Sequence, residues 1–313
     1  MGWTAKEIPD QSGRTAVVTG ANSGLGLEVS TDLARAGATV LMACRSMDRA
    51  GEALDRIRAD APGAEVDAVR LDLASLASIG DFATAARNRL PDGIDLLVNN
   101  AGVMMPPRRE TEDGFELQFG TNHLGHFALT ALLFPAMRQA EGSRVVTVSS
   151  AMARTGRLDF DNLDGSKRYS RTGAYSLSKL ANLSFAIELE RRLVESGSPL
   201  ASMAAHPGYA ATNLQKAGPL LGGGVTATIA APFMSLGNLL FAQDANAGAA
   251  PILYAATVPG LVGGSYVGPD GPGEMRGSPT VVEPVESAAD RESAQRLWEE
   301  SERLTGIEFD LQS

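Results

Sequence analysis

Short apolar runs alternate with longer stretches of helical spacing along most of the chain. The apolar runs, which predict strands, are Thr15–Thr19, Thr39–Ala43, Val66–Leu71, Ile94–Asn99, Arg144–Ser149, Leu200–His206 and Ser265–Val267. The predicted helices are Leu25–Ala36, Ser46–Ala59, Leu76–Leu90, Phe115–Arg138, Gly173–Ser196 and Ala245–Thr257. Apolar strands separated by helices are typical of a parallel sheet that is covered on both faces. The pattern therefore predicts an α/β fold, a doubly wound parallel sheet (Rossmann fold) in one domain over residues 1–313.

Two segments lie outside this alternation. Residues 268–284 are rich in Gly and Pro, which predicts an ordered loop, and an amphipathic surface helix is expected near residues 287–305. The segment 217–243 has no charged residue and contains several Gly and Pro residues, which argue against a membrane-spanning helix. A lid that touches a membrane and a lid that covers an apolar substrate are the remaining interpretations, and the second is favoured.

Composition restricts the partners of the chain. The net charge is −10 and the pI about 4.9, which argues against nucleic acid and anionic membranes as partners. The single cysteine, Cys44, allows no intrachain disulfide and suggests an inert thiol, and the first ten residues lack the apolar core of a signal peptide. We therefore expect a cytoplasmic protein that acts on a small molecule, and leave open a homo-oligomer.

The segment Thr19–Gly26 reads Thr-Gly-Ala-Asn-Ser-Gly-Leu-Gly, follows an apolar run and opens a predicted helix. A dinucleotide site needs this succession of strand, glycine turn and helix. The glycines let the backbone approach a pyrophosphate, and free N–H groups at the start of the helix bind its phosphates. A tight turn of any α/β protein is the alternative. The candidate cofactor-binding residues here are Gly20, Asn22, Ser23, Gly24, Leu25 and Gly26.

Side chains at the ends of the next predicted strands indicate which dinucleotide binds. Arg45 stands where an NAD-selective site would hold a carboxylate, and its guanidinium can pair with a 2′-phosphate, which favours NADP(H). The alternative is a solvated arginine at the start of a helix. Asp72, with Leu73 beside it, could accept a hydrogen bond from an adenine amino group or cap the following helix. Both residues are candidates for cofactor binding.

Two further motifs carry polar chemistry. The segment 99–102 (Asn-Asn-Ala-Gly) ends the fourth predicted strand, where Asn99, Ala101 and Gly102 can line a cofactor floor and tie neighbouring strands together. Tyr175 and Lys179 are four residues apart, which places a phenol and an ammonium on one face of a helix. A Tyr-x-x-x-Lys pair downstream of a glycine turn indicates a nicotinamide-dependent oxidoreductase.

Six motifs in order resemble the short-chain dehydrogenase/reductase family over roughly residues 13–268. They are Thr-Gly-x-x-x-Gly-x-Gly at 19–26, Asn-Asn-Ala-Gly at 99–102, Asn122, Ser-Ser at 149–150, Tyr-x-x-x-Lys at 175–179 and Pro-Gly at 207–208. Within the family, residues 43–45, 121–127 and 178–182 look like the retinol-dehydrogenase-like and protochlorophyllide-reductase-like branch. That branch mostly uses NADP(H).

The resemblance implies roles for four catalytic residues. Tyr175 would be the general acid in carbonyl reduction and the base in alcohol oxidation. Lys179 would lower the pKa of Tyr175 and hold the nicotinamide ribose. Ser150, the second serine of its pair, would bind the substrate oxygen, and Asn122 would bind a water in a proton relay.

The resemblance also places residues near the nicotinamide and the substrate. Pro207 and Gly208 would face the nicotinamide, and Thr212 would bond its carboxamide or a phosphate, with a plain loop hydroxyl as the alternative. The spacing between Ser150 and Tyr175 is longer than in many members of the family, so an insertion near residues 151–173 is expected to shape the substrate mouth. The segment 213–244 is expected to do the same, and its apolar residues suggest a hydrophobic substrate.

The three histidines of the chain do not predict a metal site. His123 and His126 have a spacing compatible with metal binding, but no Cys or carboxylate cluster accompanies them, so packing is the favoured interpretation. His206 is expected to be structural. The rival functions are an isomerase or dehydratase on the same fold and a dinucleotide-sensing protein. The presence of both Tyr175 and Lys179 disfavours a sensor.

Overall fold

The computed structural model describes residues 2–208 and 245–311. Thr212 and the segments 217–243 and 213–244, on which a cofactor contact and a lid were predicted, lie outside these residues. Among the residues described, no helix combines the length and the apolar character that crossing a membrane requires.

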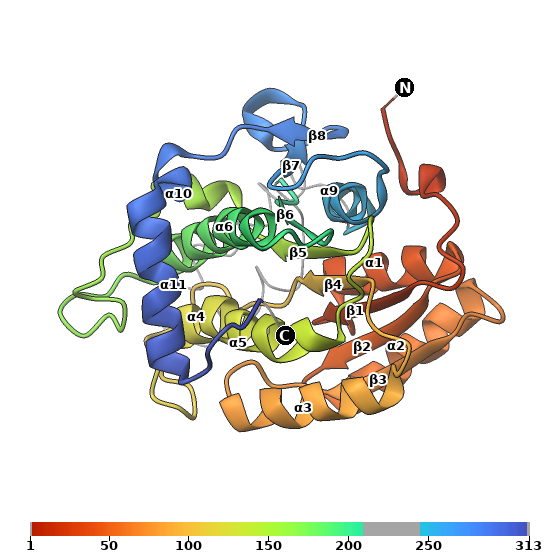
Figure 1. The fold of residues 1–313 in the computed structure, drawn as a ribbon, viewed down its shortest axis with the longest axis horizontal. Coiled ribbons are helices and arrows are strands. Elements are labelled where there is room, and N and C mark those ends of the chain that lie inside the picture. Colours follow the sequence, from red (N-terminus) through yellow and green to blue (C-terminus); the bar gives the residue numbers. More distant parts are fainter. Residues whose placement is uncertain (1, 209–244, 312–313) are drawn as a thin grey trace, which may run out of the picture.

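The strands form one sheet in the order β3-β2-β1-β4-β5-β6-β7-β8, and Figure 1 shows it at the centre of the molecule. All neighbours pair parallel except β7 and β8, which are antiparallel. The strand order reverses at β1, which lies between β2 and β4, and such a switch point leaves a crevice at the carboxyl ends of the strands. The strands are β1 (Thr15–Thr19), β2 (Thr39–Cys44), β3 (Val66–Arg70), β4 (Leu96–Asn99), β5 (Arg144–Val148), β6 (Ala201–Ala205), β7 (Tyr266–Pro269) and β8 (Pro279–Val282).

The strand β8 corrects the predicted loop at residues 268–284. This strand is short, begins with a proline and lies at the edge of the sheet, where Val281 is exposed. Proline is tolerated on an edge strand because its missing N–H costs no ladder hydrogen bond on the open side. An edge strand of this kind lacks the continuous apolar run that marked the seven strands found from the sequence.

The described helices agree with the predicted ones within a few residues, with two exceptions. Phe115–Arg138 is not continuous, because α4 passes into a π-helical turn, Gly120–Leu124, before α5 begins. The C-terminal helix is broken at Asp290, whose carboxylate accepts from the Ser293 N–H and caps the second piece. The helices are α1 (Gly24–Arg35), α2 (Met47–Asp60), α3 (Leu76–Arg89), α4 (Leu117–Phe119), α5 (Gly125–Leu133), α6 (Arg171–Ser196), α9 (Ala245–Thr257), α10 (Glu286–Ala289) and α11 (Arg291–Thr305), with short helical turns at Ala5–Glu7, Phe134–Ala136, Ala151–Thr155 and Pro272–Glu274.

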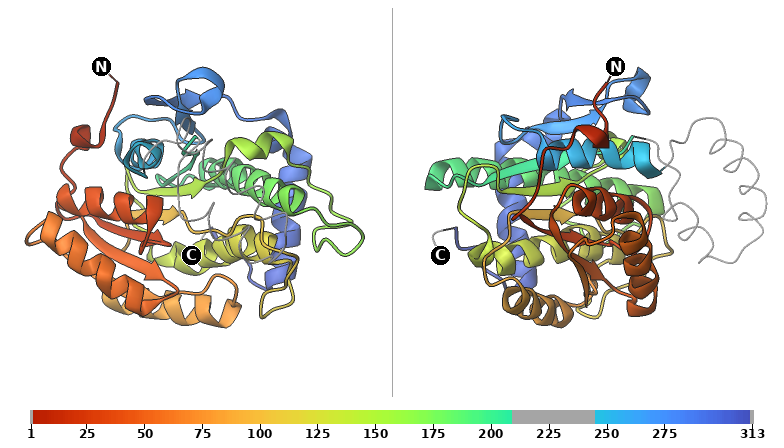
Figure 2. Two further views of the ribbon diagram at one scale, coloured as in Figure 1. Left: turned by 180° about the vertical axis from the view of Figure 1, so that it is seen from behind. Right: turned by 90° about the vertical axis from the view of Figure 1, so that its right-hand side faces the viewer.

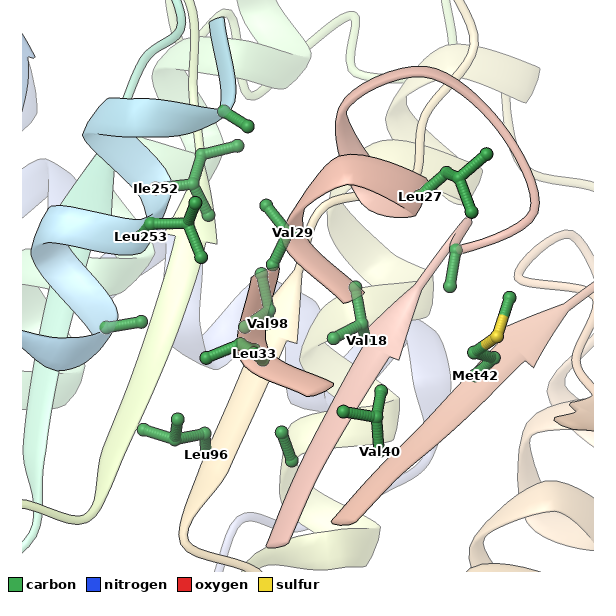
Figure 3. Packing of buried hydrophobic residues seen from close by; sticks show 14 of the residues in the cluster. Val18, Leu27, Val29, Leu33, Val40, Met42, Leu96, Val98, Ile252 and Leu253 are labelled. Carbon is green, nitrogen blue, oxygen red and sulfur yellow. The ribbon is translucent and has the colours of Figure 1, made fainter. Parts of the chain in front are cut away.

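Helices cover both faces of the sheet. Alternate residues of a strand point to opposite faces, and β1 shows this directly, since Ala16 and Val18 join one buried cluster and Val17 joins the other. Helices α1, α2 and α9 pack on the first face, where Val18, Val29 and Ile252 contribute to the core drawn in Figure 3. Helices α3, α5 and α6 pack on the second face. The predicted two-faced α/β sheet is confirmed.

Helices α10 and α11 form an outer layer over α6, as the views of Figures 1 and 2 show. The Trp298 ring of α11 stacks on Phe185 of α6, with ring centroids 5.8 Å apart. The guanidinium of Arg192 lies over the same indole. This layer therefore holds the outer side of the helix that carries the Tyr-x-x-x-Lys motif.

Candidate active site

The turn between β1 and α1 has the geometry of an anion cradle. Gly20 and Gly24 adopt positive φ values of 66° and 55°, which side chains with a Cβ adopt only with strain. Helix α1 begins at Gly24, and the hydroxyl of its N-cap residue, Ser23, makes no capping hydrogen bond. The N–H groups of the first turn and the positive end of the helix dipole are therefore free to bind phosphate.

Gly26 explains why the turn and the helix can approach so closely. A Cβ on Gly26 would lie 2.5 Å from the Gly20 carbonyl oxygen and 2.6 Å from Nδ2 of Asn100. A Cβ on Gly20 would lie 3.0 Å from that of Ala101. These contacts leave no room for side chains, so the backbone of the turn packs directly against the end of β4.

The hydroxyl of Thr19 holds the turn to the segment after β4. Its Oγ1 accepts hydrogen bonds from the N–H groups of Asn100 and Ala101, both at 2.9 Å, and Nδ2 of Asn100 donates to the Thr19 carbonyl at 2.8 Å. The predicted tie between neighbouring strands is therefore present. The side chain of Asn99 instead donates to Oγ1 of Thr130 and holds α5 against β4.

His126 extends this network to Asn122. Nε2 of His126 lies 2.9 Å from Oγ1 of Thr19, and its Nδ1 lies 2.8 Å from the Asn122 carbonyl oxygen. Burial lowers the pKa of His126 to about 4, so the ring is neutral at pH 7. Because a carbonyl can only accept, Nδ1 carries the proton and Nε2 accepts from Thr19.

His123 is also a packing residue. Its Nε2 lies 2.9 Å from Oγ of Ser301 on α11, its ring lies among aromatic side chains, and burial lowers its pKa to about 3. In the part of the chain that the structure describes, no group of His, Cys, Asp and Glu side chains could hold a metal ion.

Asn122 lies in the π-helical turn and is fully buried. Its Oδ1 accepts from the Val103 N–H at 2.7 Å, and its Nδ2 donates to the Val103 carbonyl at 3.0 Å and to Oγ of Ser178 at 2.9 Å. A Cβ on Gly102 would lie 3.0 Å from Oδ1 of Asn122. The amide therefore fixes the segment after β4 against α6.

Tyr175 and Lys179 lie on the inner face of α6, and both are almost fully buried. Burial raises the pKa of Tyr175 to about 12, and a hydrogen bond with Ser150 opposes this shift. Burial lowers the pKa of Lys179 to about 8. Nζ of Lys179 donates to the Val148 carbonyl at 2.9 Å and lies 5.9 Å from the centroid of the Tyr175 ring.

Burial sets the net direction of the Tyr175 pKa in the chain alone, and the effect expected of Lys179 stays a prediction. Lys179 was expected to lower the pKa of Tyr175, but in the chain alone burial of the phenol outweighs any effect of the ammonium. Burial is the largest contribution because desolvation disfavours the charged phenolate more than the neutral phenol. A lowered pKa at Tyr175 thus needs a further positive charge beside the phenol.

The two serines after β5 have different partners. Oγ of Ser149 donates to the Lys179 carbonyl at 2.7 Å and so anchors α6. Oγ of Ser150 caps the turn Ala151–Thr155, where it accepts from the Met152 N–H, and it also hydrogen-bonds Tyr175. The geometry thus places Ser150, rather than Ser149, beside the phenol.

Arg45 follows β2 at the same edge of the sheet. Its side chain is exposed and, among residues 2–208 and 245–311, has no hydrogen-bond or ion-pair partner. The thiol of Cys44 is buried, and burial raises its pKa to about 11, in agreement with an unreactive thiol. Arg45 is therefore a free cation near the start of α1, in a position to meet an anionic ligand.

Asp72 does not cap the next helix. Its Oδ1 accepts from the Ala74 N–H at 3.0 Å, which closes a turn, and Ser75 is the residue that caps α3. The capping interpretation is thus wrong, because the chain makes one more turn before the helix begins. Leu73 is buried, and its carbonyl oxygen lies 2.5 Å from where a Cβ on Gly125 would be.

The Pro207–Gly208 turn follows β6. Gly208 has a φ of 65°, and a Cβ there would lie 2.5 Å from the Met275 carbonyl oxygen. The structure thus brings together the glycine turn, Ala101, Gly102, Asn122, Ser150, Tyr175, Lys179 and Gly208 at the carboxyl edge of the sheet. Four residues inside the motifs link one motif to another through side-chain hydrogen bonds, a role that the sequence did not reveal. They are Thr19, Asn100, His126 and Ser178.

Comparison with known proteins decides the family. The short chain dehydrogenase family model matches residues 14–219. The chain belongs to the short-chain dehydrogenase family. It is 40% identical to human retinol dehydrogenase 13 over 299 residues, 95% of this chain and 86% of the relative. It is 43% identical to mouse polyprenol dehydrogenase over 306 residues, 96% of this chain and 86% of the relative.

The solved structures agree with this assignment. A crystal structure of an uncharacterized protein from Mycobacterium paratuberculosis has a TM-score of 0.81 and 43% identity, with 99% of this chain and 100% of that chain covered. A short chain dehydrogenase from Burkholderia cenocepacia in complex with NADP has a TM-score of 0.62 and 21% identity, with 82% and 96% covered. This short-chain dehydrogenase is thus an oxidoreductase of the retinol-dehydrogenase-like branch, as the motifs predicted.

Proposed function

We propose that this short-chain dehydrogenase transfers a hydride between NADP(H) and a carbonyl or alcohol group of a hydrophobic substrate. The observation that carries the proposal is the convergence of Ser150, Tyr175 and Lys179 at the edge of the sheet where α1 begins. A hydride acceptor and a proton acceptor are both needed to oxidise an alcohol, and the fold provides a place for each.

The residues present fit a nicotinamide dinucleotide. The glycine turn offers free N–H groups and has no room for side chains. Lys179 is buried, and within the described residues its three N–H donors have only the Val148 carbonyl as partner, so two donors remain for ribose hydroxyls. When bound, the nicotinamide supplies or accepts the hydride.

Tyr175 is the proton carrier in this proposal. In carbonyl reduction its hydroxyl gives a proton to the substrate oxygen, and a pKa raised to about 12 keeps that proton in place at neutral pH. In alcohol oxidation the phenolate takes the proton, which requires a lower pKa. Lys179, which has a pKa of about 8 and is mainly charged at pH 7, contributes part of that shift once a ligand excludes water.

Ser150 and Asn122 complete the site. The Ser150 hydroxyl, already bonded to Tyr175, is placed to donate to the substrate oxygen and stabilise its developing negative charge. Asn122 holds the segment after β4 beside Lys179. We propose that its π-helical turn binds a water which passes protons between Lys179 and solvent.

Arg45 supports the choice of NADP(H). Its guanidinium is exposed and lacks a partner among the residues described, whereas a site selective for NAD would hold a carboxylate there. The substrate class rests on the relatives, whose names specify retinol and polyprenol, both apolar alcohols. We infer that the substrate of this chain is apolar as well.

Turnover tests the proposal. Purified protein with NADPH would be screened against lipophilic aldehydes and ketones, and with NADP⁺ against the matching alcohols, by nicotinamide absorbance. We expect oxidation of NADPH with at least one lipophilic carbonyl and little with a short, water-soluble analogue. Tight NADPH binding without turnover of any compound would instead indicate a dinucleotide sensor.

A further inference from the structure

A partly buried cluster of Arg154, His206 and Glu274 joins three loops at the edge of the candidate site. Glu274 accepts from a guanidinium nitrogen of Arg154 through Oε1 at 2.5 Å, and its Oε2 lies 3.0 Å from Nε2 of His206. These residues, which we call the Glu274 clamp, follow three adjacent strands. Arg154 comes after β5, His206 after β6 and Glu274 after β7.

The protonation of the clamp follows from its hydrogen bonds. Nδ1 of His206 accepts from the Gly208 N–H at 3.3 Å, so the ring proton is on Nε2 and is donated to Glu274. His206 is fully buried and its ring lies 5.1 Å from that of Tyr266, and burial lowers its pKa, which favours the neutral ring. Arg154 balances the carboxylate charge, and its pKa is raised by the hydrogen bond with Glu274.

The clamp is attached to groups of the site at both ends. Arg154 lies in the turn that Ser150 caps, and that serine hydrogen-bonds Tyr175. On the other side, Nδ1 of His206 accepts from the Gly208 N–H, and the carbonyl of Met275, next to Glu274, occupies the space that a Cβ on Gly208 would need. The clamp therefore fixes Gly208 relative to Ser150.

Backbone strain marks the same residue. Glu274 has a φ of 54°, and Met105 is the other non-glycine residue with positive φ among residues 2–208 and 245–311. Strain of this kind costs free energy and persists only where surrounding contacts enforce it, as at binding and catalytic sites.

We infer that Glu274 is a positioning residue which, through His206 and Arg154, sets the Pro207–Gly208 turn against Ser150. The turn faces the nicotinamide and Ser150 faces the substrate oxygen in the proposed function, on which this inference rests. The clamp thus aligns the hydride donor with the carbonyl. A misplacement of about 1 Å at such a site can cost about 10²-fold in rate.

The test compares Glu274→Gln, Arg154→Ala and the wild type. Glu274→Gln keeps the size of the side chain but removes its charge. Arg154→Ala should leave the core intact, because 52% of the Arg154 side chain is accessible to solvent. For each protein, kcat, KM, the NADPH dissociation constant, the melting temperature and the primary isotope effect with deuterated NADPH would be measured. Glu283→Gln, an exposed carboxylate after β8, is the matched control.

We expect kcat of both variants to fall about 10- to 100-fold while NADPH affinity changes by less than about threefold, because the glycine turn holds the other half of the cofactor. The isotope effect on kcat should rise, since a misaligned hydride transfer becomes rate-limiting. Arg154→Lys should recover most of the loss. The double variant should be no slower than the slower single variant, because the residues act as one unit.

Three results would overturn the inference. If Glu274→Gln has a lower melting temperature but an unchanged kcat and isotope effect, the clamp only stabilises the fold. If Glu274→Gln fails to fold, the same result in Arg154→Ala leads to the same conclusion. Failure of the wild type to turn over any substrate with NADPH would remove the proposed function, and the clamp's role with it. An active wild type with fully active variants would remove the clamp alone.

Discussion

Oγ1 of Thr19 lies 2.9 Å from Nε2 of His126, and this contact joins the glycine turn before α1 to the π-helical turn that carries Asn122. The same oxygen accepts from two backbone N–H groups after β4. One hydroxyl therefore connects the part of the site that would hold phosphates with the part that would hold the proton relay.

Replacing Thr19 by Val should lower both the stability of the protein and its affinity for NADPH. Valine has the same shape but leaves the N–H groups of Asn100 and Ala101 and Nε2 of His126 without partners, at about 1–3 kcal/mol for each buried group. We expect the free energy of unfolding to fall by about 3 kcal/mol and NADPH to bind more weakly. Urea unfolding and NADPH titration measure the two effects. Thr84→Val, on the exposed side of α3, is the control and should change stability by about 0.5 kcal/mol or less.

Removal of the phenol hydroxyl should stop turnover. Tyr175→Phe deletes the proton carrier and leaves the glycine turn untouched, so NADPH affinity should stay near that of the wild type while kcat falls about 10²- to 10⁴-fold. Lys179→Met should lose turnover and NADPH affinity together, because the ribose loses its donors. Stopped-flow kinetics measures turnover and NADPH titration measures affinity for each variant. If Tyr175→Phe kept more than about a tenth of the activity, the proton would come from another group.

The choice between NADPH and NADH depends on Arg45. A charged hydrogen bond to the 2′-phosphate contributes about 1.5–3 kcal/mol, which corresponds to about 10- to 150-fold in affinity. Arg45→Ala should reduce NADPH affinity by that factor and leave NADH affinity unchanged. Titration of both cofactors into both proteins measures the ratio, with Lys6→Ala, on the exposed N-terminal turn, as the control. Equal affinities of the wild type for both cofactors would contradict the assignment.

The buried ammonium of Lys179 should make stability depend on pH. Its pKa falls from 10.5 in the unfolded chain to about 8 in the folded chain. Between these values the unfolded state binds more protons, so stability rises with pH from about pH 8. Relative to Lys179→Met, the wild type should gain about 2 kcal/mol between about pH 8 and pH 10, since each pKa unit corresponds to about 1.4 kcal/mol and both states are partly titrated in this range.

Urea unfolding of both proteins across this range measures the gain. Tyr175, whose pKa is raised to about 12 from 10.0, acts in the opposite direction only above about pH 10, where the unfolded state loses its proton first. A constant stability difference across the range would show that the ammonium has no lowered pKa.

The sequence predicted the sheet well because burial on both faces requires continuous apolar runs. The strand at residues 15–19 was found with its observed bounds, since every one of its residues is buried. The strand at residues 279–282 was missed for the opposite reason, because it lies at the edge, pairs on one side and has an exposed valine. The π-helical turn at Asn122 was also missed, since its amide hydrogen-bonds Val103, which is distant in the sequence, and no local pattern predicts such a contact.

The candidate site was predicted as a set of motifs but not as a network. Glycines and the Tyr-x-x-x-Lys pair have spacings that local backbone chemistry dictates, so they can be read from the sequence. Contacts such as His206 with Glu274 depend on which loops the sheet brings together, and no local pattern encodes them. The effect of burial on the pKa of Tyr175 could not be read from the motif, because burial of the phenol is a property of the whole fold.

The hydrogen-bond partner of His123 is Ser301, on the last long helix, and Glu274 also lies beyond the residues that match the family model. A ribosome releases the chain from the N-terminus onward, and a domain generally folds as a unit. The glycine turn and the Tyr175–Lys179 helix are therefore synthesised well before the groups that brace them. A nascent chain that ends between Gly208 and Glu274 lacks both the carboxylate of the Glu274 clamp and the Ser301 hydroxyl that contacts His123. The chain therefore gains these braces only when its last long helix has been synthesised.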